Sequence, residues 1–152
     1  MKIRIRLATV RDLPLLAQHR RGMYLDLGTT NAKDLDAHDR VYQRWARVRM
    51  RRGEFAGFIA EVNGKPVASG CVWLQDRQPK PGLKRVEVPY LLSMFTEQKF
   101  RGRGIATRIV KAAHAWCKER GYPRVSLHAS KMGRGVYKKL GYERSWEMWT
   151  TL

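Results

Sequence analysis

Residues 101–106 read Arg-Gly-Arg-Gly-Ile-Ala, and residues 130–142 read Ser-Lys-Met-Gly-Arg-Gly-Val-Tyr-Lys-Lys-Leu-Gly-Tyr. The first stretch follows a strand-like apolar run that ends near Thr96, and a helical pattern begins at about Gly104. A helix N-terminus presents unpaired amides and a partial positive charge, so it stabilises a diphosphate placed there. The stretch is therefore a candidate loop for binding a phosphorylated ligand.

The residue types of this loop suit that role. Gly102 and Gly104 let the backbone approach phosphates without a Cβ in the way. Arg101 and Arg103 add positive charge, and Ala106 is small enough to keep the first helical turn open. A surface turn has glycines too, so the pattern by itself leaves both interpretations open.

Two other kinds of glycine loop are excluded. A dinucleotide-binding loop normally follows the first strand of a domain and has an acidic residue about 20 positions later. Here the loop comes late, and Tyr122 and Pro123 stand where that acid is expected. A P-loop requires Gly-Lys-Ser/Thr, whereas Gly104 is followed by Ile105.

The apolar pattern around the loop predicts a single mixed α/β domain over residues 1–152. Apolar residues at 3, 5 and 7 alternate with basic ones, which is typical of a half-buried strand. After the loop, apolar residues at 105, 109, 112 and 116 repeat at helical spacing, and Gly121 follows as a cap. The expected elements are strands at 3–7, 55–62, 66–74, 86–96 and 124–129, helices from 10 or 13 to 25, at 37–52, from about 104 to 121 and at 134–140, and one or two strands from Tyr142 onward.

The second expected helix combines an apolar face with a basic one. Val41, Trp45 and Val48 are spaced four and three residues apart and form the expected apolar face. Another face carries four arginines at similar spacing, Arg40, Arg44, Arg47 and Arg51. These arginines are either a solvated surface of a basic protein or a docking stripe for an anionic partner.

Composition limits the class of protein. Lys plus Arg number 31 against 13 acidic residues, a formal net charge of +18 that attracts polyanions such as nucleic acid or a phosphorylated cofactor. No apolar run approaches the roughly 20 residues of a membrane span, and the N-terminus lacks the apolar stretch of a signal peptide. A cytoplasmic protein without membrane contact is expected. Cys71 and Cys117 are then core thiols rather than a disulfide, and neither has metal-site spacing.

The two quoted stretches together resemble the GNAT family of N-acetyltransferases. Residues 101–106 match the family's R/Q-x-x-G-x-G/A loop, and residues 136–142 look like its tyrosine-bearing helix followed by Gly-Phe/Tyr. The resemblance covers nearly the whole chain and is sharpest between Leu92 and Tyr142. It implies an acyl-CoA N-acyltransferase-like α/β (α+β) fold, with one mixed, mostly antiparallel sheet of six to seven strands flanked by about four helices.

The resemblance also implies the reaction, which is direct transfer of an acetyl group from acetyl-CoA to a primary amine in a ternary complex, without a metal. The strands at about 90–96 and 124–129 would splay apart around the pantetheine arm. One exposed strand amide would polarise the thioester carbonyl, as in an oxyanion hole. The residues expected to bind acetyl-CoA are Met94, Phe95 and Thr96 on the strand, Arg101, Gly102, Arg103, Gly104, Ile105, Ala106 and Thr107 in the loop, and Ser130.

Tyr137 matches the family's general acid, which protonates the departing thiolate; its alternative role is that of a packed helix tyrosine. Ser130 stands seven residues before it, where the family often has asparagine. Its shorter hydroxyl can still donate or accept a hydrogen bond. An ammonium acceptor must lose a proton before attack, so a base is also expected. The candidates are Glu87, Glu97 and His128, the last of which also fits a structural histidine of the sheet.

The acceptor and the partners are less defined. In the family the acceptor pocket is lined by the first two helices and the last strands, so the arginines of the second helix would stand at its rim. We therefore expect an acceptor amine that carries a carboxylate or phosphate, or an acidic protein. The sequence leaves a monomer and a homodimer both open. Two other interpretations remain, a basic nucleic-acid- or ribosome-associated binding module and an acetyltransferase fold that binds without catalysis.

Overall fold

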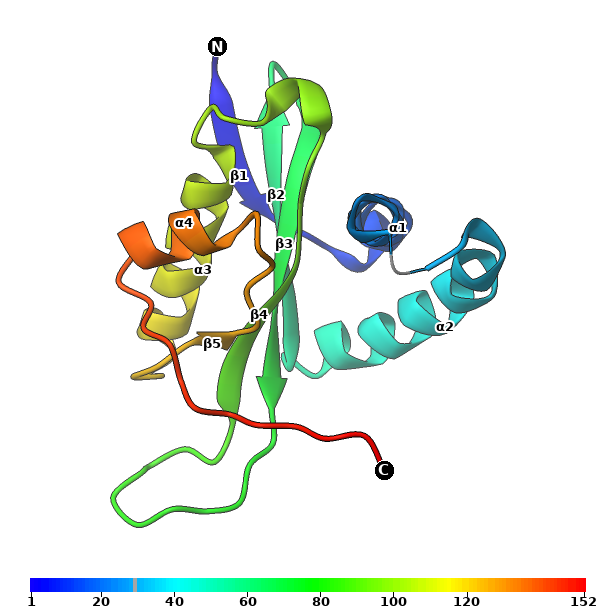
Figure 1. Ribbon diagram of the computed structural model, residues 1–152. Coiled ribbons are helices and arrows are strands. Elements are labelled where there is room, and N and C mark those ends of the chain that lie inside the picture. Colours follow the sequence, from blue (N-terminus) through cyan, green and yellow to red (C-terminus); the bar gives the residue numbers. More distant parts are fainter. Residues whose placement is uncertain (29) are drawn as a thin grey trace.

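The computed structural model describes residues 1–28 and 30–152 (Figure 1). The strands are β1 (Ile3–Leu7), β2 (Phe55–Val62), β3 (Lys65–Gln75), β4 (Val88–Thr96) and β5 (Ser126–Leu127). The α-helices are α1 (Leu13–Leu27), α2 (Ala32–Arg51), α3 (Ile105–Glu119) and α4 (Arg134–Lys139). Short 3-10 turns precede α1 and the glycine loop, at Val10–Asp12 and Gln98–Phe100.

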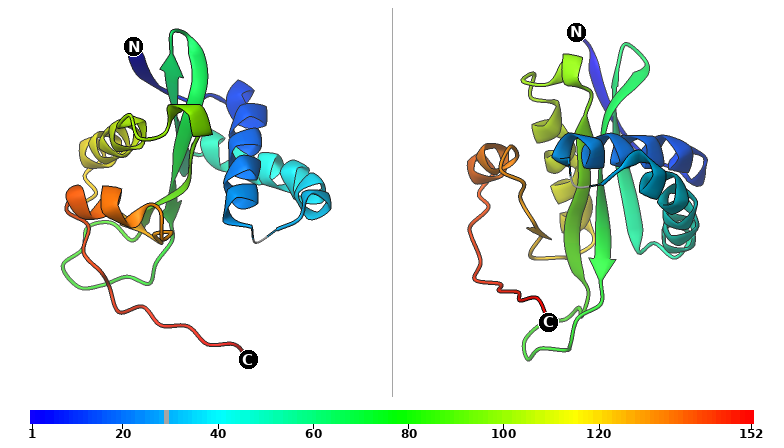
Figure 2. Two further views of the ribbon diagram at one scale, coloured as in Figure 1. Left: turned by 45° about the horizontal axis from the view of Figure 1, so that its top comes forward. Right: turned by 45° about the vertical axis from the view of Figure 1, so that its right-hand side comes forward.

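The strands form one sheet in the order β1-β2-β3-β4-β5, so strands that follow one another in sequence are also neighbours in space. The first three pairs are antiparallel, and β4 and β5 are parallel. α1 and α2 cover one face of the sheet, and α3 and α4 lie on the other (Figures 1 and 2). The predicted class, a mixed and mostly antiparallel α/β fold with four helices, is confirmed. The described residues contain five strands rather than six or seven.

Each face of the sheet has its own hydrophobic core, because β2 and β3 are buried over most of their length. Ile105, Ile109 and Val110 of α3 are at most 1% exposed and fill the core on one face. Leu13 and Leu16 of α1 fill the core on the other face, together with residues of α2. Removal of this apolar surface from water is the main force that stabilises the fold. It also holds β4 between two packed layers.

The face of α2 that enters the core differs from the expected one. Leu35, Tyr42 and Ala46 are buried, whereas Val41 is 58% and Val48 is 42% exposed. At 3.6 residues per turn, the buried face lies about 110° around the helix axis from the predicted face. The prediction was wrong because the apolar residues of α2 spread over more than one face, and only packing against α1 and β2 selects among them.

The strands predicted from Tyr142 onward are absent. Residues 143–152 lie in no helix or strand and are all exposed. Within the described chain, none of them makes a backbone hydrogen bond to another segment. They cross the end of the sheet instead of running alongside an edge strand (Figure 1). Without an adjacent edge, strand-forming residues have no ladder to join, and β5 itself is shorter than predicted.

Candidate active site

β4 and β5 are paired over a short ladder, in which Tyr90 and Leu91 pair with Ser126 and Leu127. Beyond this ladder β4 continues to Thr96, whereas the chain after β5 leaves the sheet and turns towards α4 (Figure 1). On this side, the backbone of the rest of β4 has no partner strand among the described residues. The two strands thus separate where the sequence predicted that they would.

A β-bulge lies in the part of β4 that has no partner strand on its β5 side. The β3 residues on either side of Gly70 pair with Leu92 and Phe95, so Ser93 and Met94 together stand opposite Gly70. Ser93 has a φ of 55°, in the left-handed region that a residue other than glycine rarely occupies. A bulge bends a strand and changes the direction of its backbone groups. Here it does so where the predicted pantetheine contacts begin.

The bulge depends on the absence of a side chain at Gly70. A Cβ at this position would clash with Met94 Sδ and lie 2.9 Å from Ile109 Cγ2. We expect Gly70→Ala to lower the free energy of unfolding by about 1–3 kcal/mol, as overpacking of a core does. Chemical denaturation measures the change. Gly135→Ala is the control, because a Cβ there meets nothing within 4 Å; equal stability of the two variants would contradict the prediction.

The loop after β4 leads into the N-terminus of α3. Gly102 and Gly104 have φ angles of 73° and 74°, a left-handed backbone that glycine adopts without strain. Gly104 is the N-cap of α3 and makes no side-chain cap, so the first-turn amides of Ile105, Ala106 and Thr107 are available to an anion. The loop therefore leads into an uncapped helix N-terminus, which suits an anion.

The two arginines of the loop have different surroundings. Arg101 Nε donates a hydrogen bond to the Thr96 carbonyl at 2.8 Å, and its guanidinium forms an ion pair with Asp26 of α1. Arg103 is exposed, and its guanidinium lies 5.8 Å from the centre of the Phe100 ring. Arg101 thus links the loop to β4 and to α1. The Thr96 carbonyl already accepts a hydrogen bond from this arginine.

Ser130 and Tyr137 come together around the start of α4. The Ser130 hydroxyl accepts a hydrogen bond from the Gly133 amide at 3.2 Å. A Cβ at Gly133 would lie 2.9 Å from Tyr137 Cε2 and 3.3 Å from Ser130 Oγ. The glycine therefore allows the tyrosine ring to pack against this turn. The hydroxyl proton of Ser130 is still available to a ligand.

Tyr137 is half-buried, and burial raises the pKa of its hydroxyl above the usual 10.0. No hydrogen bond joins this hydroxyl to another residue in the described part of the chain. Its ring packs edge-on against Tyr142, with centroids 5.6 Å apart, and the Tyr142 hydroxyl lies 2.6 Å from His114 Nε2. Tyr137 is thus protonated at neutral pH with its proton available, as a general acid must be. The contact of His114 with Tyr142 could not be predicted from the sequence pattern.

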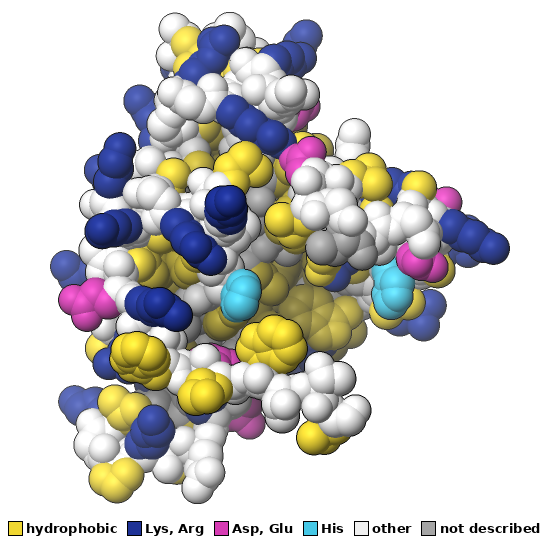
Figure 3. Space-filling model, in the orientation of Figure 1, with side chains coloured by type: hydrophobic (Ala, Val, Ile, Leu, Met, Phe, Trp, Pro, Cys, Tyr) yellow, Lys and Arg dark blue, Asp and Glu magenta, His cyan; other side chains and the backbone are white. Residues whose placement is uncertain are grey.

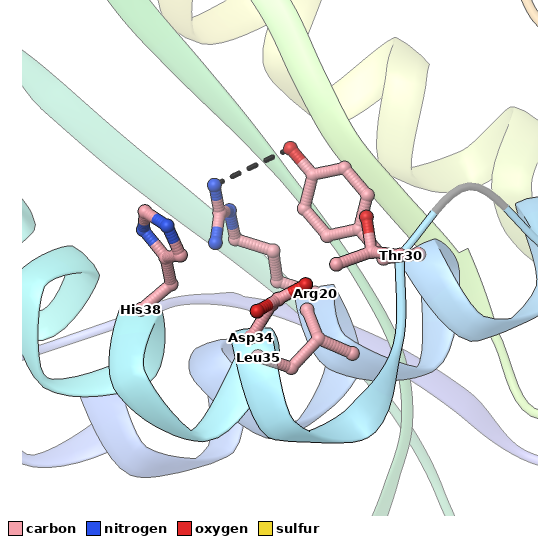
Figure 4. A pocket seen from close by; sticks show the side chains of 6 residues that line it. Arg20, Thr30, Asp34, Leu35 and His38 are labelled. Atoms are coloured by element: carbon pink, nitrogen blue, oxygen red, sulfur yellow. Dashed lines mark hydrogen bonds between the residues drawn. The ribbon is translucent and has the colours of Figure 1, made fainter.

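The opposite face of the sheet has two adjoining cavities beside α1 and α2. The first, the aromatic cavity, has a volume of about 320 Å³ and reaches the bulge of β4. It is lined by Arg20, His38, Val41, Tyr42, Trp45, Trp73, Leu92 and Ser93. The second, the polar cavity, has a volume of about 400 Å³ (Figure 4). It is lined by Arg20, Tyr24, Thr30, Asp34, Leu35 and His38.

The walls of the aromatic cavity support one another. Trp45 packs edge-on against Trp73 with ring centres 5.2 Å apart, and its ring stacks near Tyr42 at 6.5 Å. The Arg20 guanidinium lies 4.6 Å from the centre of the Tyr42 ring and 4.8 Å from that of Tyr24. Figure 3 shows apolar side chains deep in the surface between the sheet and the two helices. A molecule bound here would meet β4 on the face opposite to α4.

The α2 arginines do not stand at the rim of this cavity, contrary to prediction. Arg40, Arg44, Arg47 and Arg51 are exposed, and none of them lines either cavity. At 3.6 residues per turn they lie about 140° around the helix axis from the cavity-lining residues of α2. The arginine in the described lining of both cavities is Arg20 of α1. The stripe is therefore a solvent-facing surface, and it gives no support to an anionic acceptor.

His19 is a buried histidine that the patterns in the sequence do not single out. It is 4% exposed, its Nδ1 lies 2.9 Å from Ser69 Oγ, and its ring centre is 5.2 Å from that of Phe95. Burial lowers the pKa of His19 below its usual 6.5, and the negative charge of Glu97 opposes this shift. The sequence could have indicated this burial, because His19 follows Leu16 by three residues in α1 and therefore lies on the same face of a core-facing helix.

The structure places the three candidate general bases at different positions around β4 and β5. Glu87 precedes β4, at the end of the strand opposite to the glycine loop. Glu97 follows β4 directly, and its carboxylate lies 3.7 Å from Lys99 Nζ. His128 is exposed and follows β5 directly. Glu97 and His128 therefore flank the separated part of the two strands, and Glu87 does not.

We expect the protein to lose stability as the pH falls below about 6.5. Because burial lowers the folded-state pKa of His19 from 6.5, the unfolded chain takes up this proton first as the solution is acidified. The stabilisation is complete above the unfolded-state pKa and declines below it; His114 shifts in the same direction. The fall in melting temperature between about pH 7 and pH 5 should be smaller for His19→Gln than for the wild type. An equal fall would contradict this assignment.

Both cysteines lie in the hydrophobic cores. Cys71 and Cys117 are buried and free. Burial raises the pKa of Cys71 to about 12 and that of Cys117 to about 11, so both thiols are inert at neutral pH. Among the described residues no group of three or more His, Cys, Asp or Glu side chains is arranged to hold a metal. In the same residues we find no helix with the length and hydropathy needed to cross a membrane.

A mixed sheet with two strands that separate beside a glycine loop at a helix N-terminus is the arrangement of an acyl-CoA N-acyltransferase-like fold. The chain belongs to the acetyltransferase (GNAT) family, whose family model matches residues 18–142. The resemblance seen in the glycine loop and in the tyrosine-bearing helix is thereby confirmed. Membership of this family supports acyl transfer to nitrogen as the general activity.

Individual relatives agree with the family match. The chain is 36% identical over 110 residues to an uncharacterised N-acetyltransferase of Methanocaldococcus jannaschii; the match covers 68% of this chain and 45% of that protein, so the chain spans about half the length of this relative. A GCN5-related N-acetyltransferase of Ralstonia eutropha JMP134 has a TM-score of 0.88 at 26% identity, with 99% of both chains covered. A predicted acetyltransferase of Clostridium acetobutylicum, solved with acetyl-CoA, has a TM-score of 0.88 at 30% identity, with 99% of this chain and 96% of that chain covered.

Proposed function

We propose that the protein, as one domain over residues 1–152, transfers an acetyl group from acetyl-CoA directly to a primary amine in a ternary complex. The observation that carries this proposal is the stretch of β4 beyond Leu91, which pairs with β3 on one side and has no described partner strand on its β5 side. The glycine loop lies at the end of this stretch, and the aromatic cavity reaches it from one face. A donor and an acceptor can therefore approach the same strand from different directions. The acetyl-CoA in the Clostridium structure supports the choice of donor.

On the donor side, the amides from Gly102 to Thr107 would bind the diphosphate of acetyl-CoA, helped by the α3 dipole and by the charge of Arg103. The pantetheine arm would lie along Met94 and Phe95, where the bulge turns backbone groups out of the ladder. The Ser130 hydroxyl would donate a hydrogen bond to the arm. Arg101 holds the Thr96 carbonyl and Asp26, so we assign it to positioning the loop.

In the reaction, the amine nitrogen attacks the thioester carbonyl carbon, and the carbon–nitrogen bond forms as the carbonyl becomes an oxyanion. This tetrahedral intermediate then re-forms the carbonyl as its carbon–sulfur bond breaks. An amide of β4 would stabilise the oxyanion of the intermediate, an effect worth a few kcal/mol. Tyr137 donates its proton to the departing CoA sulfur. The proton lost by the amine passes to solvent by way of Glu97 or His128, the two predicted bases that flank the separated strands.

We further propose that the acceptor amine is attached to an apolar or aromatic body. Tyr42, Trp45 and Trp73 form the walls of the cavity that reaches the bulge. An apolar environment disfavours the ammonium form and so increases the fraction of free amine, which is the nucleophile. Arg20 lines the aromatic cavity, whose described walls include no carboxylate, so it repels a second positive charge there. Polyamines are therefore expected to be poor acceptors.

Release of free CoA with a panel of amines tests this function. Aromatic amines such as tryptamine should give higher kcat/KM than spermidine or amines that carry a carboxylate. Trp73→Ala should lower kcat/KM for the aromatic amines about tenfold, with the dissociation constant of acetyl-CoA unchanged. Preference for spermidine would reject the acceptor assignment. Binding of acetyl-CoA without CoA release for any amine or peptide would reject catalysis.

The second candidate function is a basic binding module for nucleic acid, and the exposed α2 arginines favour it. The two candidates differ in their response to salt. Nonspecific binding of a polyanion weakens steeply as salt rises, whereas a formed cofactor site retains acetyl-CoA. Thermal stabilisation by acetyl-CoA and by a short DNA duplex, compared over a salt series, separates them. Stabilisation by DNA alone at about 0.2 M salt would favour the binding module.

A further inference from the structure

The polar cavity lies between α1 and α2 and adjoins the aromatic cavity that we propose for the acceptor. Arg20 and His38 line both cavities, so the two spaces meet at these side chains. The polar cavity is the larger of the two, at about 400 Å³ against about 320 Å³. An acceptor whose aromatic body fills the first cavity can therefore extend past Arg20 into the second.

Opposite charges face the polar cavity from its two helices. Arg20 of α1 and Asp34 of α2 point into the same space, and no hydrogen bond or ion pair joins these two described side chains (Figure 4). A cationic group placed there would meet the charge of Arg20, and an anionic group would meet that of Asp34. A neutral group with both a donor and an acceptor is attracted by both residues. The cavity thus favours a dipolar group over an ion.

The side chains of this cavity also keep free hydrogen-bonding capacity. Arg20 Nη2 donates a hydrogen bond to the Tyr24 hydroxyl at 3.3 Å, so the hydroxyl proton of Tyr24 is still available to a ligand. Asp34 Oδ2 accepts a hydrogen bond from Asn31 Nδ2 at 2.7 Å, whereas Oδ1 accepts none within the described chain. The cavity therefore offers a donor for a carbonyl oxygen and an acceptor for an N–H, which are the two groups of an amide.

The order of these regions matches one class of amine. Leu92 and Ser93 of the β4 bulge, beside which the reacting amine must stand, line one end of the aromatic cavity. Trp45 and Trp73 of the same cavity suit an aromatic ring, and the polar cavity begins at Arg20. In an α-amino amide the amine, the side chain and the amide branch from a single carbon. Each of the three groups can therefore enter its own region.

We propose that the acceptor is an α-amino amide with an aromatic side chain, the group found at the amino end of a peptide or in a free amino-acid amide. The inference rests on the proposed acetyltransferase function and names the substrate class of the same site. The amide carbonyl accepts a hydrogen bond from the Tyr24 hydroxyl, and the amide N–H donates one to Asp34. Tyr24 and Asp34 thereby determine specificity beyond the aromatic ring.

Release of CoA with tryptophanamide, tryptophan methyl ester and tryptophan tests this class. The amide and the ester both have a carbonyl beside the amine, so their amines are similarly basic, but only the amide has an N–H for Asp34. The wild type is expected to give a kcat/KM for the amide at least about tenfold above that for the ester. Tryptophan should give the lowest value, because its carboxylate meets Asp34. Equal values for amide and ester, or a preference for tryptophan, would overturn the proposal.

The variant Asp34→Ala isolates the bond to the amide N–H. It is expected to lower the amide-to-ester ratio of kcat/KM to about one, because neither substrate then has an acceptor for its distal group. Asp36→Ala is the matched control, since it also removes an acidic side chain from α2. The Asp36 side chain is 71% exposed, and Arg21 keeps its second partner Asp39 at 3.2 Å. The control should keep the wild-type ratio; a ratio that survives Asp34→Ala would contradict the assignment.

Tyr24→Phe isolates the bond to the carbonyl, because it removes the hydroxyl and keeps the ring, which lies 4.8 Å from the Arg20 guanidinium. Relative to tryptamine, which has no carbonyl, kcat/KM should fall about three- to tenfold for the amide and the ester alike. An unchanged ratio to tryptamine would overturn the role of Tyr24.

Two further amines identify the source of the amide and separate this inference from the function on which it rests. A kcat/KM for Trp-Gly-Gly-amide at or above that for tryptophanamide supports a peptide as the natural acceptor, and a lower value supports a free amino-acid amide. Release of CoA with tryptamine but without preference for the amide rejects only the amide. Absence of release with every one of these amines, while acetyl-CoA binds, rejects the proposed function.

Discussion

The substitution Tyr137→Phe is expected to lower the turnover number about 100-fold or more, whereas the affinity for acetyl-CoA stays within about twofold. The change removes only the hydroxyl, and the ring keeps its edge-on contact with Tyr142. In the wild type this hydroxyl carries a proton at neutral pH, because burial raises its pKa. Without that proton the CoA sulfur must leave as an unprotonated thiolate. Steady-state release of CoA and calorimetry with acetyl-CoA measure the two quantities.

Tyr142→Phe is the matched control for this experiment. The Tyr142 hydroxyl lies 2.6 Å from His114 Nε2, so its loss costs about 0.5–1.5 kcal/mol of stability. It removes no group from the reacting atoms, and turnover should stay within a few-fold of the wild type. Full turnover of Tyr137→Phe would leave Tyr137 as a packed helix residue. Equal losses in both variants would indicate a shared structural effect instead of general acid catalysis.

The substitution Gly104→Ala is expected to raise the dissociation constant of acetyl-CoA at least about tenfold. Gly104 has a φ of 74°, where a residue other than glycine costs about 1–2 kcal/mol. It is also the N-cap of α3, where the proposed diphosphate meets the first-turn amides. An alanine there either displaces the loop or places a Cβ beside the ligand. Calorimetry measures the affinity, and the melting temperature reports the strain.

Gly53→Ala separates the two effects. Gly53 follows α2 with a φ of 71°, and a Cβ there meets nothing within 4 Å, as is also true at Gly104. Its replacement should therefore cost a similar amount of stability and leave the affinity for acetyl-CoA unchanged. If both variants bind acetyl-CoA as the wild type does, the diphosphate lies elsewhere and the proposed donor site is rejected.

The donor half of the site could be predicted because its chemistry is local. Gly102 and Gly104 adopt left-handed backbone that glycine tolerates best, whatever surrounds the loop. The apolar spacing of α3 predicts a helix directly after them, and its N-terminal amides are unpaired in any context. Ser130 and Tyr137 approach each other across one short turn, so their separation in sequence is sufficient to bring them together.

The acceptor half could not be predicted, because it depends on packing between distant elements. The apolar residues of α2 spread around the helix, and only docking against α1 and β2 buries Tyr42 and leaves Val41 in water. The same docking turns the arginine stripe away from the aromatic cavity. Arg101 likewise has its ion-pair partner on α1, 75 residues away in the sequence. Because Arg101 pairs with Asp26, its guanidinium is engaged in the protein and is not free for the phosphate that the loop motif suggests.

The number of strands also separates what the sequence determines from what the tertiary structure decides. A glycine turn or a helix completes its backbone hydrogen bonds within a few residues, so the sequence by itself determined the loop, the helices and the position of Tyr137. A strand completes its bonds only with another strand, wherever that strand lies. The composition of residues 145–151 therefore indicates a strand, whereas the tertiary structure alone decided that no edge of the same chain receives it. The same reason explains why the acceptor cavity and the burial of His19 emerged only from the assembled fold.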